Sequence, residues 1–402
     1  MKKELKTSKK KLAFVLGLRP DLIRAVLIMQ YLEKAKDIEV IFIWSGQNYS
    51  DNLKGIFFRE LHVREPDYDL GCKGKTDAET TSQLIAKLYP LLEKIKPAAT
   101  VFLGDTNTTI GALAAAQLNI PIIHIEGCWR SYDWRMPEEK YRTIIDHISD
   151  VIYTYEDEYK QKGIAEGLNP KNIVVTKNPT VDILERFYFS QKEKLEKKAT
   201  KQFFKKREIQ DKDYFVMTCH RRENVHIRKS FQAILKLVAN APCTVYFPAS
   251  YRTQKIIKSQ NIKLPKNLLM VPPVGYEEML ILMTHSKAVI TDSGTLSEES
   301  CILNVPCINM RKSTERPEIY DAGGTVKFDP DKPEEYTPEI VYKKLKKITG
   351  KNWKHTLGDG KASERIANDI ILRLREGRLR GFLPENNHLP IARSFIEDGI
   401  KI

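Results

Sequence analysis

The sequence predicts an α/β protein in which two domains each contain a parallel sheet covered by helices. Short apolar runs alternate with stretches of helical periodicity along most of the chain, which is the pattern of successive strand–helix–strand units. At 402 residues the chain is also longer than one hydrophobic core usually serves. A Lys-, Glu- and Gln-rich stretch at 187–213 interrupts the alternation. We therefore expect domains over 1–190 and 207–355, a helix over 356–380 that packs back on the first domain, and a tail over 381–402.

Composition is typical of a globular protein. Hydrophobic residues make up 42% of the chain, and no apolar run approaches the roughly 18 residues of a membrane span, so no membrane insertion is expected. The six cysteines stand without CxxC spacing, and the apolar run behind the basic N-terminus is short. We therefore expect reduced thiols, no metal site and no signal peptide, as in a cytoplasmic protein.

The net charge of +14 raises the question of a polyanionic partner. The lysines are spread over helical faces and gathered in stretches such as 192–206, and nothing resembles a recognition helix or an RNA platform. We therefore attribute most of the positive charge to lysines on the solvated surface, and no nucleic-acid partner is expected. A basic chain also suits a small dianionic ligand.

The first apolar strand, at 11–16, ends in the turn Gly17-Leu18-Arg19-Pro20-Asp21, and helical spacing follows over 22–32. A dinucleotide fingerprint needs GxGxxG in this turn so that the backbone can approach a pyrophosphate, and only one glycine is present. The turn therefore argues against NAD, and no cofactor is expected. The other strands and helices of the first domain are expected at 40–44, 51–61, 77–95, 100–103, 120–125, 151–155, 156–163 and 173–175.

Two of these strands stop at acidic residues. The strand at 100–103 precedes Asp105, and the strand at 120–125 precedes Glu126. Residues just past the carboxyl ends of parallel strands line the ligand crevice of an open sheet. Asp105 and Glu126 should therefore lie at one edge, with Arg19 and Arg24 facing the same crevice.

A helix that begins after Pro137 carries Glu138 and Glu139 in its first turn. Carboxylates at this position stabilise the positive end of a helix dipole, which is the expected role of Glu139. Glu138 lies one residue nearer the loop and is the expected site residue. His124 is expected to pack inside the sheet as a strand residue.

A second alternating series begins after the polar stretch. Its strands and helices are expected at 214–218, 230–238, 244–247, 268–271, 277–285, 288–291, 296–303 and 307–310. Ser293-Gly294-Thr295 opens one of these helices directly after a strand, and so presents backbone N–H groups and a positive dipole end to an anion. The alternative interpretation is an ordinary helix N-cap.

Two further cationic residues follow strands of the second series. Arg316 is placed to bind a phosphate in a bidentate manner, the alternative being a surface ion pair with a neighbouring glutamate. His220 stands between a strand and two arginines, Arg221 and Arg222, where phosphate contact or proton transfer is expected. The helix start at 293–295 and Arg316 are expected at the same edge of the sheet, and together they favour a phosphate site.

The motifs in this order resemble the non-hydrolysing UDP-N-acetylglucosamine 2-epimerase family. The resemblance spans residues 11–378 and implies two Rossmann-like domains in a glycosyltransferase B arrangement, with the active site in the interdomain cleft. The motifs that carry it are GLRPD at 17, GDT at 104, HIEGCWRSYDWRMPEE at 124–139, ISD at 148–150, HRRENV at 220, DSGTLSEE at 292–299 and TERPE at 314.

The resemblance also implies which residues act. Ser293 to Thr295, Arg19 and His220 would hold the diphosphate, Glu299 the ribose hydroxyls, and the segment 272–276 would border the uracil. The implied catalytic residues are Asp105, Glu126, Glu138 and His220. The implied substrate-binding residues are Arg19, Arg24, Arg130, Pro272, Tyr276, Ser293, Gly294, Thr295, Glu299 and Arg316.

The chain departs from the family pattern at several positions. Leu18 replaces a threonine, Gly127-Cys128 replaces an Ala-Gly pair, and Thr295 replaces the second glycine of the DSGG loop. The segment 249–253 stands where a histidine is often found. The Thr295 form and Arg252 resemble the branch that acts on modified UDP-sugars, which leaves the identity of the sugar open.

The implied reaction is reversible C2 epimerisation of a UDP-2-acetamido sugar, by anti elimination of UDP and re-addition through a 2-acetamidoglycal. Three alternatives stay open from the residues: a retaining UDP-sugar glycosyltransferase, a hydrolysing epimerase that releases UDP and free sugar, and a nucleotide-sugar sensor without turnover. The resemblance further implies a homodimer and allosteric activation by the nucleotide sugar, with Gln47 near the second site.

Overall fold

The computed structural model describes residues 9–46 and 51–379, and the chain forms two compact units. Unit 1 comprises Met1–Ser50, Val63–Asp182 and Asp359–Ile402, and unit 2 comprises Asp51–His62 and Ile183–Gly358. The expected first domain included the segment 51–62, which the structure groups with unit 2. The reason is local, because the Glu60 carboxylate accepts hydrogen bonds from the backbone N–H groups of Tyr276 (2.6 Å) and Glu277 (3.2 Å). Gln47 and the tail beyond 379 lie outside the described residues.

Unit 1 contains a seven-stranded sheet in which every pairing is parallel. The strand order is β3-β2-β1-β4-β5-β6-β7, so the winding reverses between β1 and β4. In open α/β sheets ligands bind beyond the carboxyl ends of the strands at such a reversal. The strands are β1 (Lys10–Leu16), β2 (Ile38–Trp44), β3 (Tyr68–Asp69), β4 (Ala99–Leu103), β5 (Ile122–Ile125), β6 (Val151–Thr154) and β7 (Ile173–Val175).

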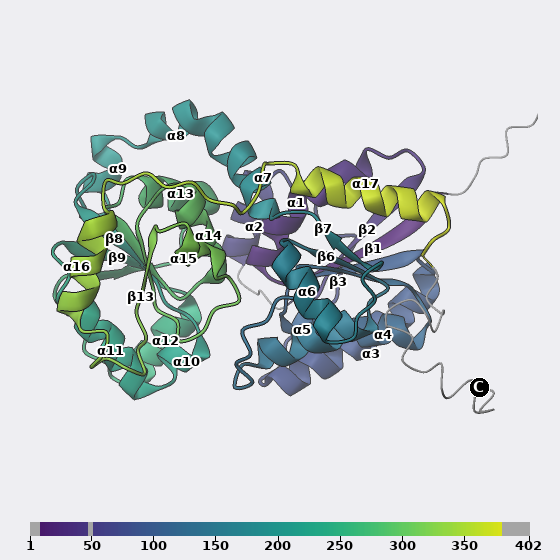
Figure 1. The fold of residues 1–402 in the computed structure, drawn as a ribbon, viewed down its shortest axis with the longest axis horizontal. Helices are drawn as coiled ribbons and strands as arrows, with labels where there is room; N and C mark the ends of the chain where they lie inside the picture. The colour runs from purple at the N-terminus through teal and green to yellow at the C-terminus, as the bar shows by residue number, and fades with distance from the viewer. Residues whose placement is uncertain (1–8, 47–50, 380–402) are drawn as a thin grey trace, which may run out of the picture. The chain divides into compact units, whose positions relative to one another are not determined.

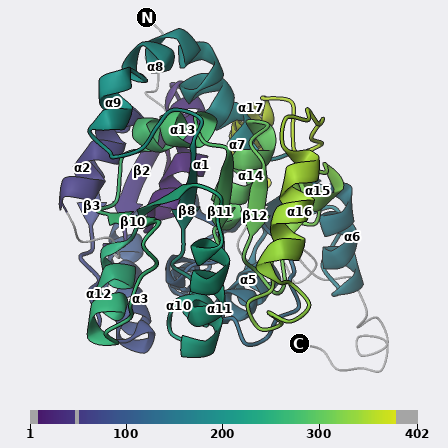
Figure 2. The ribbon, with the colours of Figure 1, turned by 90° about the vertical axis from the view of Figure 1, so that its left-hand side faces the viewer.

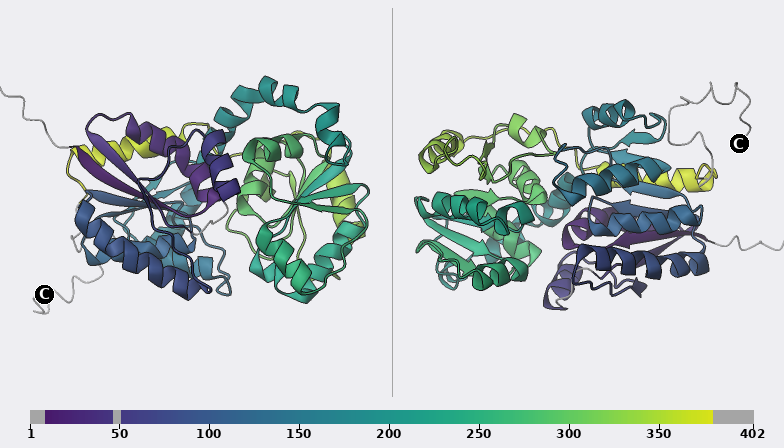
Figure 3. Two further views of the ribbon diagram at one scale, coloured as in Figure 1. Left: turned by 180° about the vertical axis from the view of Figure 1, so that it is seen from behind. Right: turned by 90° about the horizontal axis from the view of Figure 1, so that it is seen from below.

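Helices cover both faces of this sheet. Helices α1 and α17 lie together on one face, and α3, α4 and α5 lie on the other (Figures 1 and 3). Leu84, Leu88 and Leu92 recur at helical spacing along α3 and pack on the strand residues Val15 and Phe102. The helices are α1 (Arg19–Glu33), α3 (Asp77–Ile95), η1 (Asn107–Gly111), α4 (Ala112–Gln117), α5 (Pro137–Ile148), α6 (Asp157–Ala165), α7 (Pro179–Phe187), which crosses the unit boundary, and α17 (Ala362–Arg375).

Unit 2 repeats the architecture with a six-stranded parallel sheet of order β10-β9-β8-β11-β12-β13. Its winding reverses between β8 and β11. One face packs on α11, α12 and α16, and the other on α9, α13 and α14 (Figure 2). The strands are β8 (Tyr214–Thr218), β9 (Thr244–Pro248), β10 (Leu268–Val271), β11 (Ala288–Thr291), β12 (Cys307–Asn309) and β13 (Thr325–Lys327). The helices are α2 (Asp51–Glu60), η2 (Phe189–Gln191), α8 (Lys192–Lys198), α9 (Lys201–Lys205), α10 (Arg222–Val225), α11 (Arg228–Ala239), α12 (Tyr251–Ser259), α13 (Tyr276–Thr284), α14 (Gly294–Ile302), α15 (Glu318–Asp321) and α16 (Pro338–Ile348).

The expected fold class, two Rossmann-like α/β domains, is confirmed, and several short elements go beyond the sequence prediction. The segment that departs from the family pattern is the start of α12, which Ser250 caps by accepting a hydrogen bond from Thr253 N at 3.1 Å. Within the described ranges, no helix is both long and apolar enough to cross a membrane. All six cysteines are free, as expected.

Helix α17 ties the C-terminal part of unit 1 to α1, and this contact can be tested. Ile366 on α17 is 0% exposed, whereas Leu372 on the same helix is 47% exposed. Ile366→Ala should cost about 2–4 kcal/mol of unfolding free energy because it leaves a cavity. Leu372→Ala should cost less than about 1 kcal/mol. Chemical denaturation of both variants measures the difference, and equal losses would show that α17 is not packed as described.

Candidate functional site

The two acidic strand ends of unit 1 lie side by side, as the sequence predicts. Leu103 at the end of β4 pairs with Ile125 at the end of β5, and Gly104 N donates to Ile125 O at 3.0 Å. Asp105 and Glu126 therefore leave the sheet at neighbouring positions. Strand β4 also adjoins β1, so Asp105 lies beside the reversal of strand order and Glu126 lies one strand further along the sheet.

Glu126 has an unusual backbone conformation. Its φ angle is +77°, in the left-handed region that residues with a side chain rarely adopt. The N–H groups of Glu126 and Gly127 both donate to Tyr153 O, at 2.9 and 3.0 Å, which holds this turn in place. Strained conformations persist where the surroundings impose them, and they concentrate at functional sites. The strain directs the Glu126 carboxylate to one defined position.

Glu126 is 3% exposed, and Arg24 and Tyr155 are among the partners of its carboxylate. Arg24 Nη1 forms an ion pair with Oε2, and the Tyr155 hydroxyl lies 3.2 Å from the same oxygen. Arg24 also reaches Asp21, with Nη2 to Oδ1 at 3.3 Å. Arg24 is therefore brought to the predicted crevice, where it supports Glu126.

Asp21 lies in the same group of side chains, although it is not among the residues predicted from the sequence. It lies in the first turn of α1 and is 1% exposed. Burial, opposed by Arg24 and reinforced by the charge of Asp105, raises the pKa of Asp21 to about 7. A carboxyl group in this environment holds its proton far more readily than one in water.

Asp105 is held by a second buried arginine. Arg142 is 1% exposed and contacts Asp105 through Nη2, while its Nη1 lies 3.0 Å from Glu139. Glu139 in turn accepts hydrogen bonds from Ser131 N (3.0 Å) and Tyr132 N (2.8 Å). Glu139 therefore has a supporting role, in line with the expectation that it is not the site residue, and Glu138 beside it is partly exposed.

Arg130, predicted as a substrate ligand, is buried in a network of ion pairs. Arg130 is 3% exposed, and its guanidinium contacts Asp146 at 2.7 Å and Glu166 at 2.8 Å. Asp146 also binds the ring of His124, with Nδ1 to Oδ1 at 2.7 Å. His124 Nε2 contacts Gly104 O at 2.8 Å. This network lies inside unit 1, as expected for His124, and ties the turn before Asp105 to the turn after Glu126.

In unit 2, strands β8 and β11 are neighbours at the reversal of strand order and bring His220 and Ser293 to one edge. Asp292 lies between them and accepts hydrogen bonds from His220 N at 3.0 Å and Arg221 N at 2.9 Å. Burial favours the neutral form of Asp292, but the His220 charge, the Arg221 N–H and Asn224 together hold its pKa below the usual value. The His220 side chain is 48% exposed and so is accessible to a ligand.

Helix α14 begins at Gly294, with Ser293 as its N-cap. Ser293 Oγ accepts a hydrogen bond from Leu296 N at 3.3 Å, so the ordinary capping interaction is present. A Cβ atom on Gly294 would lie 2.3 Å from Arg316 Nη1. Glycine is therefore required here, because the Arg316 guanidinium packs directly against the first turn of α14.

The remaining predicted ligand residues of unit 2 are mostly buried. Arg316 is 4% exposed and pairs with Glu298 at 2.8 Å and with Glu315, so the ion pair with a neighbouring glutamate is present. The Tyr276 hydroxyl donates to Glu299 Oε1 at 2.9 Å and orients that carboxylate. Pro272 is exposed.

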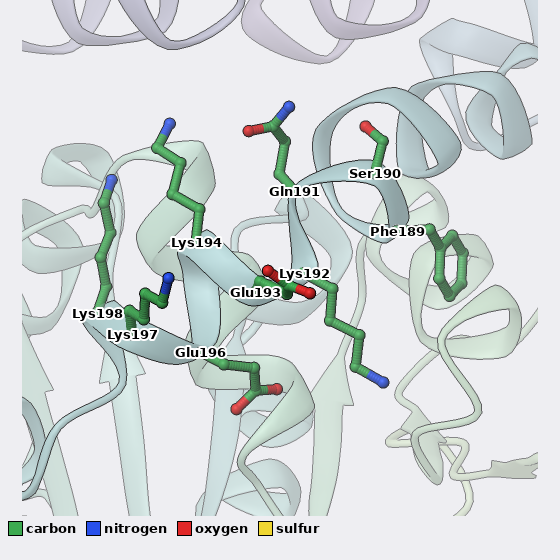
Figure 4. Close-up of a pocket in the computed structure, with 9 residues that line it drawn as sticks. All are labelled: Phe189, Ser190, Gln191, Lys192, Glu193, Lys194, Glu196, Lys197 and Lys198. Atoms are coloured by element: carbon green, nitrogen blue, oxygen red, sulfur yellow. The ribbon is translucent and has the colours of Figure 1, made fainter.

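A hollow of about 1280 Å³ lies away from these residues, along α8 of unit 2 (Figure 4). Its lining residues all come from 189–194 and 196–198, and include both lysines and glutamates. Lys194 lies 3.1 Å from Glu277, and Lys198 pairs with the same carboxylate. None of the predicted site residues lines this hollow.

The fold and its strand-end residues define a two-domain α/β enzyme, with buried acid groups at the strand ends of one domain and a helix N-terminus beside an exposed histidine at those of the other. Comparison with known proteins identifies the family. A family model described as UDP-N-acetylglucosamine 2-epimerase matches residues 30–371. The chain belongs to this family, as the motifs indicated.

Individual relatives agree over most of the chain. A UDP-N-acetylglucosamine 2-epimerase of Methanocaldococcus jannaschii is 36% identical over 89% of this chain and 97% of the relative. A crystal structure of the epimerase of that organism, in complex with UDP-GlcNAc and UDP, has a TM-score of 0.81 at 34% identity and covers 90% of this chain and 99% of that chain. A UDP-2,3-diacetamido-2,3-dideoxy-D-glucuronate 2-epimerase of Pseudomonas aeruginosa is 30% identical over 89% of this chain and 98% of the relative.

The contact between Gly294 and Arg316 generates a stability prediction. Gly294→Ala should destabilise unit 2 by about 1–3 kcal/mol, because the buried guanidinium must leave its carboxylate partners to make room. Thr295→Ala, at the next and partly exposed position, should cost less than about 1 kcal/mol. Thermal and chemical unfolding measure both. A Gly294→Ala protein as stable as the parent would show that Arg316 does not pack against α14.

Proposed function

We propose that the protein reversibly inverts C2 of a UDP-2-acetamido sugar, with UDP-N-acetylglucosamine and UDP-N-acetylmannosamine as the first pair to test. The observation that carries the proposal is the placement of Asp105 and Glu126 at adjacent strand ends, with Asp105 beside the reversal of strand order. Family membership and the names of the relatives support the substrate class.

The chemistry explains why carboxylates are needed. No carbonyl group adjoins C2 to acidify its hydrogen. Breaking the bond between C1 and the phosphate oxygen, with the electron pair leaving on UDP, gives C1 oxocarbenium character and makes the C2 hydrogen acidic. A carboxylate then takes that proton, and C1 and C2 become doubly bonded in a 2-acetamidoglycal. Protonation of C2 from the opposite face, with UDP returned to C1, inverts the centre.

Three carboxyl groups of unit 1 are assigned to this chemistry. Asp105, Glu126 and Glu138 share the roles of base, acid and electrostatic stabiliser of the cationic C1. Carboxylates flanking a sugar ring stabilise oxocarbenium character in the same way during glycoside cleavage. Arg24 and Arg142 fix the orientations of Glu126 and Asp105.

The nucleotide is assigned to the strand ends of unit 2. The first turn of α14, at 293–295, offers backbone N–H groups and a positive dipole end to the diphosphate, and the exposed His220 side chain adds a donor. Glu299, oriented by Tyr276, is suited to accept hydrogen bonds from ribose hydroxyls. Arg19 is partly buried in unit 1 and is assigned to the diphosphate through the family motif.

The sugar itself can carry further substituents. The Pseudomonas aeruginosa relative is named for a 2,3-diacetamido glucuronate, and the departures at Thr295 and 249–253 resemble the branch that acts on modified sugars. A panel of UDP-amino sugars followed by proton NMR identifies the preferred one. The homodimer and activation by the nucleotide sugar are further expectations from the resemblance, and the cytoplasmic location is an expectation from the cysteines. Light scattering tests the homodimer, and rate curves against substrate concentration test the activation.

The assignment of the carboxylates predicts the effect of removing each charge. Asp105→Asn, Glu126→Gln and Glu138→Gln should each slow interconversion by about 100-fold or more, because each removes a carboxylate that transfers a proton or stabilises the cationic C1. Proton NMR of the two epimers measures the rates. Glu158→Gln is the control, since Glu158 lies on α6 of the same unit, is 63% exposed, and forms an ion pair with the neighbouring Lys162 at 2.7 Å. Near-normal rates in all three site variants would refute the assignment.

A further inference from the structure

The carboxyl group of Asp21 lies beside Arg24 in unit 1 and has no assigned role in the proposed reaction. Asp21 Oδ1 accepts from Arg24, whereas Oδ2 is buried and has no hydrogen-bond partner among the residues that the structure describes. A buried oxygen that accepts no hydrogen bond is costly, and it is more costly when it carries charge. A proton bound at Oδ2 therefore reduces the free-energy cost of burying this carboxyl group.

The guanidinium of Arg24 is divided between two acids. Nη1 contacts Glu126, and Nη2 contacts Asp21 at 3.3 Å. A Cβ atom on Gly104 would lie 3.5 Å from both Arg24 Nη2 and Asp21 Oδ1, so the Asp21 carboxyl lies against the backbone that leads into Asp105. A neutral Asp21 leaves Arg24 to Glu126. An ionised Asp21 competes for Arg24 and adds a negative charge beside Asp105.

We propose that Asp21 is a positioning residue. Its neutral form keeps Arg24 on Glu126 and avoids charge repulsion with Asp105, and loss of its proton to solvent lowers the rate of the reaction. This inference rests on the proposed function. Asp21 is not assigned a contact with substrate, and it acts through Arg24 and Asp105.

The electrostatics place this transition near neutral pH. Burial, opposed by Arg24 from α1 and by the Leu18 backbone, and reinforced by Asp105 after β4, raises the pKa of Asp21 to about 7. Glu126 at the end of β5 acts on Asp21 through the shared guanidinium, and Arg142 of α5 acts through Asp105. Two carboxylates that share one site cannot both ionise easily, and one of their pKa values rises.

The first test compares the pH dependence of kcat in the parent protein, Asp21→Asn and Asp37→Asn. Above about pH 7 the parent rate should fall by up to about tenfold per pH unit, as the neutral fraction of one group does. Asp21→Asn mimics the neutral form and should lose this alkaline decline, with KM for the UDP-sugar unchanged. Asp37 is the control, because its exposed pair with Arg375 lowers its pKa to about 2, and Asp37→Asn should keep the parent profile.

The outcomes separate the two claims. A parent protein that does not interconvert the epimers at any pH contradicts the proposed function. A parent protein that is active, with the same alkaline decline in Asp21→Asn, overturns the role of Asp21 alone. The conservative Asp21→Glu should restore a decline with pH, which a purely structural role would not require.

A second measurement is independent of activity. A carboxyl group whose pKa is raised in the folded state contributes stability that is complete below its unfolded value and is lost as pH rises through about 7. The Tm of Asp21→Asn minus the Tm of the parent should therefore become more positive between about pH 5 and about pH 8. A constant difference across this range would show that Asp21 does not take up its proton on folding, and would overturn the proposal even if the variant is inactive.

Discussion

The carboxylates at the strand ends of unit 1 depend on buried guanidinium groups. A buried carboxylate without a partner is strongly destabilising, and breaking a buried pair by removing one member costs about 3–5 kcal/mol. Arg24 accompanies Glu126, and Arg142 accompanies Asp105. Because each guanidinium is planar and rigid, it fixes the direction of its carboxylate as well as its charge. The ion pairs that stabilise these carboxylates in the folded chain therefore also fix their positions.

Unit 2 has the same type of fold but a different arrangement of charged residues at its strand ends. Here the His220 side chain is exposed at a strand end, and buried acids hold the basic residues around it in place. Asp292 holds the backbone that leads to His220, and Glu298 holds Arg316 against Gly294. A helix begins at the strand end in each unit, but only in unit 2 does the described first turn combine a capping serine with a glycine packed on an arginine.

The sequence predicted the parts of the site that follow from strand order. Asp105 and Glu126 could be placed together because residues after neighbouring parallel strands meet at one edge. The partners were harder to predict, since Arg24 and Glu126 are 102 residues apart and nothing local in either motif specifies their contact. Asp21 was passed over because an acid in the first turn of a helix has an ordinary explanation, and its burial arises only from the packed sheet. The burial of Arg130 likewise could not be predicted, since the motif that contains it does not specify its pairs with Asp146 and Glu166.

The central claim is that these carboxyl groups exchange the proton on C2 of a nucleotide sugar that is released and recaptured. The most direct measurement is incubation of the parent protein with UDP-N-acetylglucosamine in deuterated water, followed by proton NMR. The account predicts deuterium at C2 of both epimers while nearly all of the UDP stays attached to sugar at equilibrium. Free sugar and UDP as the main products, or epimers that form without deuterium at C2, would contradict it.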